Sequence, residues 1–482
     1  MDVKLRIGAE LRESGDGRYF ECLSPLSGEV VTRVAAATVD DAIAAADRAG
    51  EAFGEWSETG PNQRRALMTK AAELLTERAD HFSQCIIDET GTSAAWARFN
   101  VQGSINALRE AAALATQIAG ENIPSDKPGT LAITTRVPVG VVLGIAPWNA
   151  PLLLGIRAIA MPLICGNTVV LKASELCPGT HHLIGELFTD AGYPPGVVNV
   201  ISHDAASAPG IVEALIAHPA VRRVNFTGST RVGRIIGELA GRHLKPALLE
   251  LGGKAPLVVL EDADLDQAVN AAAFGAFMNQ GQICMSTERI VVDAKIADEF
   301  ARRLAAKSAT LEAGDPRIGN PVLGALIGEA AANQVQALID DAVNQGARLL
   351  TPVQRDKNIF GAVVLDGVTA EMRVYAEESF GPIASIVRVN GPEEAIRVAN
   401  DTEYGLAAAV YGRDLARTLR VARRIEAGVC HVNGATVNSE PQLPFGGVKA
   451  SGYGRFGGRA AIEEFTDLRL LTVQTQDQSF PF

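Results

Sequence analysis

Two patterns of hydrophobic residues alternate through the middle of the chain. Short runs rich in Val, Ile and Leu are typical of buried strands, and the longer amphipathic stretches between them are typical of helices. We predict strands at Val139–Ile145, Thr168–Leu171, Val197–Ile201 and Val221–Phe226, with helices at Leu152–Leu163, Thr180–Ala191 and Ala208–Ala217. Because nearly continuous apolar strands separated by helices form parallel sheets covered on both faces, this half predicts an α/β unit of a nucleotide-binding class.

A second series of the same kind follows residue 253. We predict strands at Leu257–Leu260, Ile290–Val292, Val363–Leu365, Ile383–Val389 and Val429–Val432, with helices at Leu265–Asn279, Ile296–Leu311, Ala331–Gln345 and Ala416–Ala427. After two or three short strands, the N-terminal region predicts helices at Val39–Glu55, Gln63–Thr90 and Ser104–Ala119. Residues Ile123–Val137 and Leu470–Gln474 have an extended pattern that belongs to neither series.

The stretch Val137–Gly155 is almost free of polar residues and long enough to be tested as a membrane span. Pro147 and Pro151 interrupt it, and Arg157 follows closely. We therefore predict a buried strand that ends at about Pro147 and a helix from about Ala150, with no membrane contact.

Composition narrows the class of protein. Of 482 residues, 47% are hydrophobic and 21% charged, which excludes a mostly disordered chain. The net charge of −12 argues against nucleic acid as a partner, because phosphate binding needs a basic surface. The six cysteines are scattered, with no CxxC pair and no histidine at metal-ligand spacing. We expect free thiols, no metal, no signal peptide and a cytoplasmic location.

Three residues beside predicted loops have side chains suited to carbonyl chemistry. Cys284 follows a Gln-Gly-Gln-Ile loop, and its thiolate could attack a carbonyl carbon, although a free cysteine is commonly a small buried hydrophobic residue. Glu250 ends an apolar run before two glycines, where desolvation would raise its pKa toward that of a general base; a solvated loop carboxylate is the alternative. Asn149 could donate to an oxyanion or cap the helix that follows it.

A second group of residues could bind an anionic cofactor. The segment Phe226–Gly233 follows a strand and opens a helix, and helix N-termini favour anions, although this spacing is not the GxGxxG fingerprint. Lys172 and Glu175 lie just past the strand at Thr168–Leu171, where they could contact ribose hydroxyls or form an ordinary surface ion pair. Glu378 lies beside a Ser-Phe-Gly-Pro turn, and the same two interpretations, a ligand contact or an ordinary surface charge, apply to it.

Taken together and in this order, the motifs resemble the aldehyde dehydrogenase superfamily over nearly the whole chain. The matching segments are Pro147-Trp148-Asn149, Lys172-Ala173-Ser174-Glu175, Phe226-Thr227-Gly228-Ser229-Thr230, Glu250-Leu251-Gly252-Gly253-Lys254, Gly281-Gln282-Ile283-Cys284, Glu378-Ser379-Phe380-Gly381-Pro382 and Pro444-Phe445-Gly446-Gly447. Within that superfamily, Trp96, Gly281–Arg289 and Ser451–Arg459 are most similar to the bacterial salicylaldehyde dehydrogenases, followed by those acting on benzaldehyde and vanillin.

The resemblance implies a role for each matched residue. Cys284 would be the nucleophile, Glu250 the general base, and Asn149 an oxyanion donor together with the Cys284 N–H. Cofactor contacts would come from Trp148, Lys172, Glu175, Phe226, Gly228, Ser229, Gly233, Leu251, Glu378 and Phe380. The substrate tunnel would be lined by Trp96, Arg157, Ile283, Met285 and Phe445. The implied reaction is oxidation of an aromatic aldehyde through a thiohemiacetal and a thioester on Cys284, which water activated by Glu250 then releases as the acid.

Single residues refine this expectation. Glu175 can accept from a ribose 2′-hydroxyl but would repel a 2′-phosphate, so we predict NAD rather than NADP. Arg157 could meet a ring hydroxyl of the substrate, or it could pair with a carboxylate for structural reasons. The alternatives are an aliphatic or semialdehyde dehydrogenase with the same mechanism, a cysteine hydrolase without a redox step, and a non-catalytic scaffold.

The resemblance also implies an architecture. We expect an α/β fold with a Rossmann-type NAD-binding domain (1–119 and 140–250), an α/β catalytic domain (251–464) and a small bridging β element (120–139 and 465–482). The exposed edges of the bridging strands need pairing, so we expect a homodimer or homotetramer.

Overall fold

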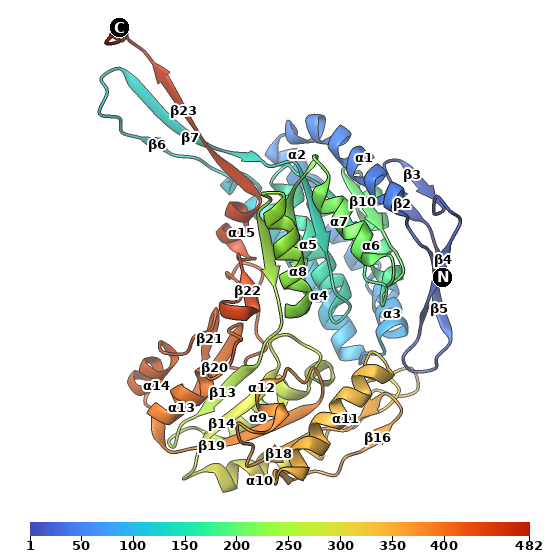
Figure 1. Ribbon diagram of the computed structural model, residues 1–482, viewed down its shortest axis with the longest axis vertical. Coiled ribbons are helices and arrows are strands. Elements are labelled where there is room, and N and C mark those ends of the chain that lie inside the picture. The colour runs from blue at the N-terminus through green and yellow to red at the C-terminus, as the bar shows by residue number, and fades with distance from the viewer.

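The computed structural model describes residues 1–482 and contains two twisted α/β sheets, with a long β ribbon that projects from the first (Figure 1). The eight strands of the first sheet lie in the order β22-β12-β11-β8-β9-β10-β2-β3. Their bounds are Gly452–Tyr453, Ala247–Glu250, Val221–Thr227, Val141–Ile145, Thr168–Lys172, Val198–Ile201, Leu5–Ile7 and Glu10–Arg12. The five strands from β12 to β10 are parallel and almost wholly buried. The apolar runs predicted four of them, and β12 was missed.

Helices cover both faces of this sheet. One face carries α1 (Val39–Ser57), α7 (Ala208–Ala217) and α8 (Thr230–Arg242). The other face carries α2 (Pro61–Glu77), α3 (Ala79–Thr90), α4 (Ala94–Leu114), α5 (Pro151–Ile164) and α6 (Pro178–Asp190). The doubly covered parallel sheet expected from the sequence is therefore confirmed.

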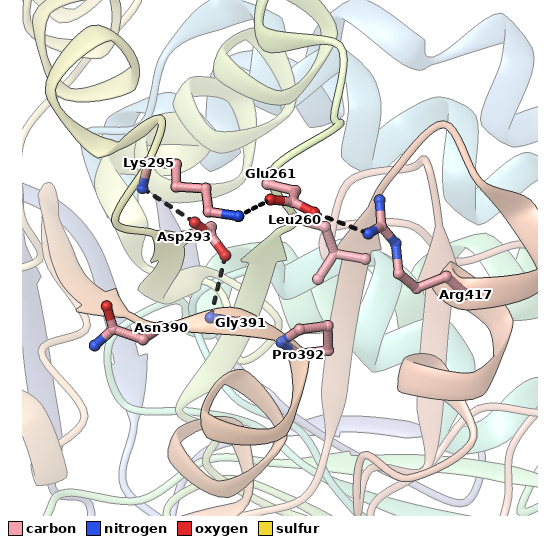
Figure 2. A pocket seen from close by; sticks show the side chains of 8 residues that line it. All are labelled: Leu260, Glu261, Asp293, Lys295, Asn390, Gly391, Pro392 and Arg417. Carbon is pink, nitrogen blue, oxygen red and sulfur yellow. Dashed lines mark hydrogen bonds and ion pairs between the residues drawn. The ribbon is translucent and has the colours of Figure 1, made fainter.

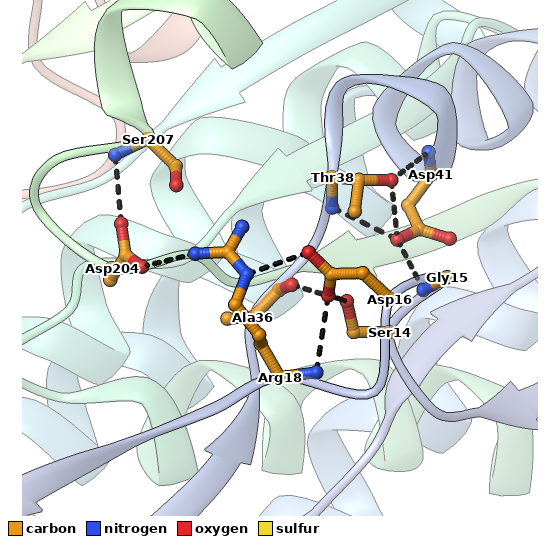
Figure 3. Close-up of polar contacts among 9 residues, drawn as sticks. All are labelled: Ser14, Gly15, Asp16, Arg18, Ala36, Thr38, Asp41, Asp204 and Ser207. Atoms are coloured by element: carbon orange, nitrogen blue, oxygen red, sulfur yellow. Dashed lines mark hydrogen bonds and ion pairs between the residues drawn. The ribbon is translucent and has the colours of Figure 1, made fainter.

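Polar contacts hold the N-terminal residues 14–18 against this sheet (Figure 3). Thr38 and Asp41 form a capping box that starts α1, and Asp41 also accepts from the Gly15 N–H at 2.9 Å. Arg18 bridges Asp16 at 2.6 Å and Asp204 at 3.1 Å. Because Asp204 follows β10, the N-terminal turn is tied to the carboxyl edge of the sheet. Beside it, β1 (Asp2–Val3), β5 (Val30–Ala35) and β4 (Tyr19–Leu23) form a small separate sheet.

The second sheet has seven strands in the order β15-β18-β19-β14-β13-β20-β21. They span Arg348–Leu349, Val363–Asp366, Ile383–Val389, Thr287–Asp293, Ala255–Val259, Ala407–Tyr411 and Val429–Val432, and all but β15 are parallel. One face is covered by α9 (Leu265–Phe277) and α10 (Ala297–Ser308). The other is covered by α11 (Glu329–Asn344), α12 (Arg373–Ala376), α13 (Gly391–Asn400) and α14 (Leu415–Ala422). A short hairpin joins β16 (Arg355–Asp356) to β17 (Ile359–Phe360).

The projecting ribbon consists of β6 (Asn122–Ile123), β7 (Thr130–Pro138) and β23 (Thr466–Gln474). Strands β7 and β23 pair antiparallel along their whole length, from Thr466 opposite Pro138 to Gln474 opposite Thr130. The extended character expected for both segments is confirmed. Helix α15 (Gly458–Glu464) leads from the body of the molecule into β23 (Figure 1).

Some predicted elements differ from the structure. The helix predicted over 63–90 is two helices, because the chain breaks at Arg78 between α2 and α3. The helix predicted from Ser104 begins ten residues earlier, where Ser93 caps α4 by accepting from the Trp96 N–H. Strand β20 was missed because its Ala-rich sequence lacks the β-branched signal. No helix is both long and apolar enough to cross a bilayer, and Val137–Gly155 contains the end of β8 and the start of α5, as predicted.

Candidate active site

Four neighbouring strands of the first sheet end level with one another. The register sets Ile145 opposite both Lys172 and Phe226, and it sets Thr227 opposite Glu250. The loops that follow β8, β9, β11 and β12 therefore emerge along one edge. This is the carboxyl edge of a doubly wound sheet, where such folds bind their ligands.

The loop before Cys284 has an unusual backbone. Helix α9 ends at Phe277, and Asn279, Gln280 and Gly281 then take left-handed conformations with φ of 49°, 55° and 73°. A Cβ at position 281 would lie 2.0 Å from the Gly381 carbonyl oxygen, so only glycine fits there. This distorted turn ends the helix two residues earlier than predicted and directs the Cys284 segment toward the first sheet.

A buried hydrogen-bond network joins this loop to Asn149. The Asn149 Nδ2 donates to the Gln282 carbonyl at 3.0 Å, and the Asn149 carbonyl accepts from Trp96 Nε1 at 2.9 Å and from Asn279 Nδ2 at 3.0 Å. The Asn279 Oδ1 in turn accepts from Thr92 Oγ1 at 2.6 Å. Because Ala150 is the N-cap of α5 and no side chain caps it, the capping interpretation of Asn149 is wrong. The second N–H of the Asn149 side-chain amide has no partner in the chain.

The three residues expected to carry the chemistry lie together. The Glu250 carboxyl and the Cys284 thiol lie close enough for each to shift the pKa of the other, and Glu250 Oε1 has no hydrogen-bond partner. Burial raises the pKa of Glu250, while the neighbouring Cys284 thiol and the Arg157 guanidinium lower it. Burial and the Glu250 charge raise the pKa of the Cys284 thiol well above its usual value, and Arg157 lowers it. The Cys284 N–H donates to no group within the chain.

Cys284 and Asn149 open into a cavity of about 740 Å³ with a mainly apolar wall. All five residues expected to line the substrate tunnel border it: Trp96, Arg157, Ile283, Met285 and Phe445. The Arg157 guanidinium lies 5.0 Å from the Phe445 ring centre and 5.3 Å from that of Phe456, and it donates to Ser439 Oγ at 3.4 Å. It forms no ion pair, so the structural pairing with a carboxylate is wrong.

Residues from both halves of the chain meet on the other side of Cys284. The Gly253 N–H donates to Glu378 Oε1 at 2.8 Å, and burial raises the pKa of Glu378 to about 8. The Phe380 ring stands edge-on to Trp148 with 5.7 Å between ring centres. Lys172 is 8% exposed and forms no hydrogen bond or ion pair within the chain, and burial lowers its pKa. Glu175 lies partly exposed just beyond it.

A fully buried ion pair fixes the loop that carries Glu378 and Phe380. Lys254 Nζ lies 2.7 Å from Glu288 Oε2, and both side chains are almost inaccessible. The Glu288 Oε1 accepts from the backbone N–H groups of Ser379 and Phe380 at 3.0 and 3.1 Å. One carboxylate therefore holds two consecutive backbone donors of this loop.

The glycines of the Phe226–Gly233 segment allow close packing. A Cβ at Gly228 would meet the Phe226 ring at 2.5 Å, and one at Gly233 would meet the Leu251 side chain at 2.3 Å. Phe226 is itself a core residue, and its ring packs against Gly228 just past the end of β11. Ser229 caps α8 by accepting from the Val232 N–H, and the first turn of that helix remains open to an anion.

A second cavity, of about 270 Å³, lies at the carboxyl ends of β13, β14 and β19 (Figure 2). Its charges are compensated within the chain: Glu261 pairs with both Lys295 and Arg417, and Asp293 accepts from the Gly391 N–H at 3.1 Å. It contains no nucleophile and no unpaired acid. The cavity at Cys284 is therefore the better candidate active site.

Sequence reasoning missed several residues of the site. Thr92, Asn279 and the 437–443 segment have no distinctive motif, and they reach the site only through tertiary contacts. The glycine after Asn279 and Gln280 was the single local signal that this helix would end in a special turn.

Comparisons with known proteins agree with this geometry. The model of the aldehyde dehydrogenase family matches residues 11–471. The chain is 58% identical to a vanillin dehydrogenase of Pseudomonas fluorescens and 49% identical to a salicylaldehyde dehydrogenase of Pseudomonas putida, with all of each chain covered. Relatives of both kinds expected from the sequence are thus found, and the vanillin dehydrogenase of Pseudomonas fluorescens has the higher identity of these two.

The fold is likewise similar to a solved structure. A salicylaldehyde dehydrogenase from Pseudomonas putida G7, crystallised with salicylaldehyde, superposes with a TM-score of 0.98 at 50% identity, and all of each chain is covered. The family match over nearly the whole chain, the identity to these relatives and the shared fold lead to one conclusion: this chain belongs to the aldehyde dehydrogenase family, and it is an oxidoreductase of that class.

Proposed function

We propose that this protein oxidises an aromatic aldehyde to the carboxylic acid with NAD, through a covalent intermediate on Cys284. One observation carries the proposal: Cys284 and Asn149 line a mainly apolar cavity of about 740 Å³, and the buried Glu250 carboxyl lies close enough to Cys284 to shift the pKa of its thiol. The names of the similar vanillin and salicylaldehyde dehydrogenases support an aromatic substrate.

The first step is capture of the aldehyde. Glu250 lies beside the Cys284 thiol, and burial raises its pKa, which makes it a stronger base toward the thiol proton than a solvated carboxylate. As the sulfur adds to the carbonyl carbon, the oxygen becomes an alkoxide. The free N–H of the Asn149 amide and the unpaired Cys284 N–H are the donors that receive this charge.

The second stage is release of the acid. When bound, the nicotinamide cofactor supplies an acceptor for the hydride that leaves the thiohemiacetal carbon. Glu250 then accepts a proton from the water that attacks the thioester on Cys284. Its orphaned Oε1 is available for that water, and the same oxyanion donors serve the second addition.

The chain's residues fit a dinucleotide at the carboxyl edge of the first sheet. Aldehyde dehydrogenases use NAD or NADP. Lys172 is a largely buried cation with no hydrogen bond or ion pair in the chain, which suits it to bind an anionic or hydroxyl group of a ligand. Lys172 and Glu175 would hold the adenosine ribose, the open first turn of α8 after Ser229 would hold the pyrophosphate, and Glu378 would hold the nicotinamide ribose. Trp148, Leu251 and Phe380 would flank the rings.

Glu175 supports NAD over NADP. Its carboxylate can accept from a 2′-hydroxyl and would repel a 2′-phosphate. The Glu175→Gln variant is expected to gain efficiency with NADP relative to NAD. Equal kcat/KM for the two cofactors in the unaltered enzyme would overturn the preference.

An absorbance assay at the reduced-nicotinamide band tests the proposed function. Salicylaldehyde, benzaldehyde, vanillin and an aliphatic aldehyde are compared with NAD, and the aromatic aldehydes are expected to have the higher kcat/KM. Cys284→Ser is expected to abolish turnover, because a serine hydroxyl is a far weaker nucleophile than a thiolate. Equal efficiency with the aliphatic aldehyde would refute the aromatic preference. Release of acid without NAD would indicate a hydrolase.

The projecting ribbon supports a homodimer or homotetramer. On β23, Leu468, Leu470 and Leu471 are exposed in the single chain, and the edges of the ribbon are unpaired. Light scattering is expected to give a mass of two or four chains, and a monomer would contradict this proposal.

A further inference from the structure

The active-site cavity has an inner and an outer part that differ in burial. Near Cys284 its wall is buried: Trp96 is 3% exposed and Ile283 4%. Phe99, Phe274 and Leu443 also line the cavity, yet they are 43%, 46% and 45% exposed. Large apolar side chains that both border a cavity and face solvent mark its mouth, where they can contact a ligand that extends out of the cavity.

The cavity is larger than a single-ring aldehyde needs. At roughly 30 Å³ for each water-sized atom, its volume of about 740 Å³ holds about 25 non-hydrogen atoms, about two to three times the size of benzaldehyde or vanillin. The lining residues of α4 extend from Trp96 to Ala111. At about 1.5 Å per residue, this part of the helix spans about 22 Å, several ring lengths.

The wall between the inner and outer parts is flat and aromatic. The rings of Trp96 and Phe99 are stacked, with 4.9 Å between centres and 14° between planes. Trp96 is held in place by its hydrogen bond to the Asn149 carbonyl, so this surface has a fixed relation to Cys284. Flat rings pack on such a surface with more contact than a flexible alkyl chain does.

We propose that Phe99, Phe274 and Leu443 form an outer aromatic subsite. It accepts the second ring of a two-ring aldehyde that extends from the para position, such as biphenyl-4-carbaldehyde. With the aldehyde carbon at Cys284, the para axis of the first ring points away from the nucleophile and toward the mouth, whereas an ortho ring would meet the buried inner wall. This inference rests on the proposed function and deepens its substrate class.

The test compares three aldehydes with the complete enzyme and NAD: benzaldehyde, biphenyl-4-carbaldehyde and biphenyl-2-carbaldehyde. We expect kcat/KM for the 4-isomer to exceed that for benzaldehyde about tenfold, the value of a well-packed aromatic contact, and the 2-isomer to be the poorest substrate. Because the outer contacts are the same before and during the reaction, the gain is expected in KM and not in kcat.

Variants at the mouth provide the second arm. Phe99→Ala and Phe274→Ala are each expected to lower the ratio of kcat/KM for the 4-isomer to that for benzaldehyde about five- to tenfold. Phe480→Ala is the matched control, because this phenylalanine is 71% exposed and lies outside the cavity, and it is expected to leave the ratio unchanged.

The outcomes separate this inference from the proposed function. If the enzyme oxidises benzaldehyde but rejects the 4-isomer, or if neither mouth variant changes the ratio, the outer subsite is refuted and the function stands. If no aromatic aldehyde is oxidised, the proposed function fails, and the subsite fails with it.

Discussion

Replacing Thr92 by valine tests whether the buried network positions Asn149. The two side chains have the same shape, so the variant mainly deletes the 2.6 Å hydrogen bond from Thr92 Oγ1 to Asn279 Oδ1. Asn279 is 1% exposed, and no water can replace the lost donor readily. A buried acceptor left without a partner costs about 1–3 kcal/mol, so we expect the free energy of unfolding to fall by about 2 kcal/mol in urea titrations.

The Thr92→Val substitution should also slow catalysis. The Asn279 amide, once released, no longer fixes the Asn149 carbonyl and the Gln282 carbonyl together. Loss of an oxyanion donor costs about 10²–10³ in kcat, and a donor that is displaced and not deleted is expected to cost about 10-fold, with KM little changed.

The control for this experiment is Thr92→Ser. It keeps the hydroxyl and removes only a methyl group, so kcat is expected to stay within about twofold of the unaltered enzyme. If the valine and serine variants have the same kcat, the link between Thr92 and the oxyanion site is refuted, whatever the loss of stability.

Three further predictions follow from the site. Glu250→Gln is expected to lower steady-state turnover by about 10²–10⁴ and to leave an acylated enzyme visible by mass spectrometry; hydrolysis at the normal rate would exclude Glu250 as the base. Arg157→Gln removes the positive charge that lowers the pKa of Cys284 and of Glu250, so the acid limb of the pH profile of kcat/KM should move to higher pH. Arg157→Lys keeps the charge and should leave the acid limb nearly in place. Identical profiles for the two variants would contradict this role of Arg157. Lys254→Met leaves the buried Glu288 carboxylate without its partner, so the free energy of unfolding in urea should fall by about 3–5 kcal/mol. Arg242→Met, which breaks an exposed ion pair, should lower it by less than about 1 kcal/mol. Equal losses would mean that the buried pair contributes no more to stability than the surface pair.

Local sequence signals located most of the framework. Four central strands of the first sheet, β8 to β11, were predicted within about two residues, because strands buried on both faces need continuous runs of Val, Ile and Leu. This signal does not identify β20, whose sequence is Ala-Ala-Ala-Val-Tyr. Its small side chains are buried because neighbouring strands and helices cover them, and such burial does not need branched residues. The start of α4 was also misplaced, because the helix begins at its N-cap Ser93 and not where the apolar periodicity becomes clear.

The sequence by itself determined the two α/β units and the kinds of side chain available for catalysis. Only the tertiary structure decided which of these side chains meet. Asn149 and the Gln282 carbonyl are 133 residues apart, and their hydrogen bond exists because the loop after α9 turns through left-handed residues against the first sheet. Hydrophobic period and motif spacing are local properties, whereas a hydrogen bond between distant segments, the desolvation of Glu250 and the exposure of Phe99 at a cavity mouth arise only when the two sheets pack together.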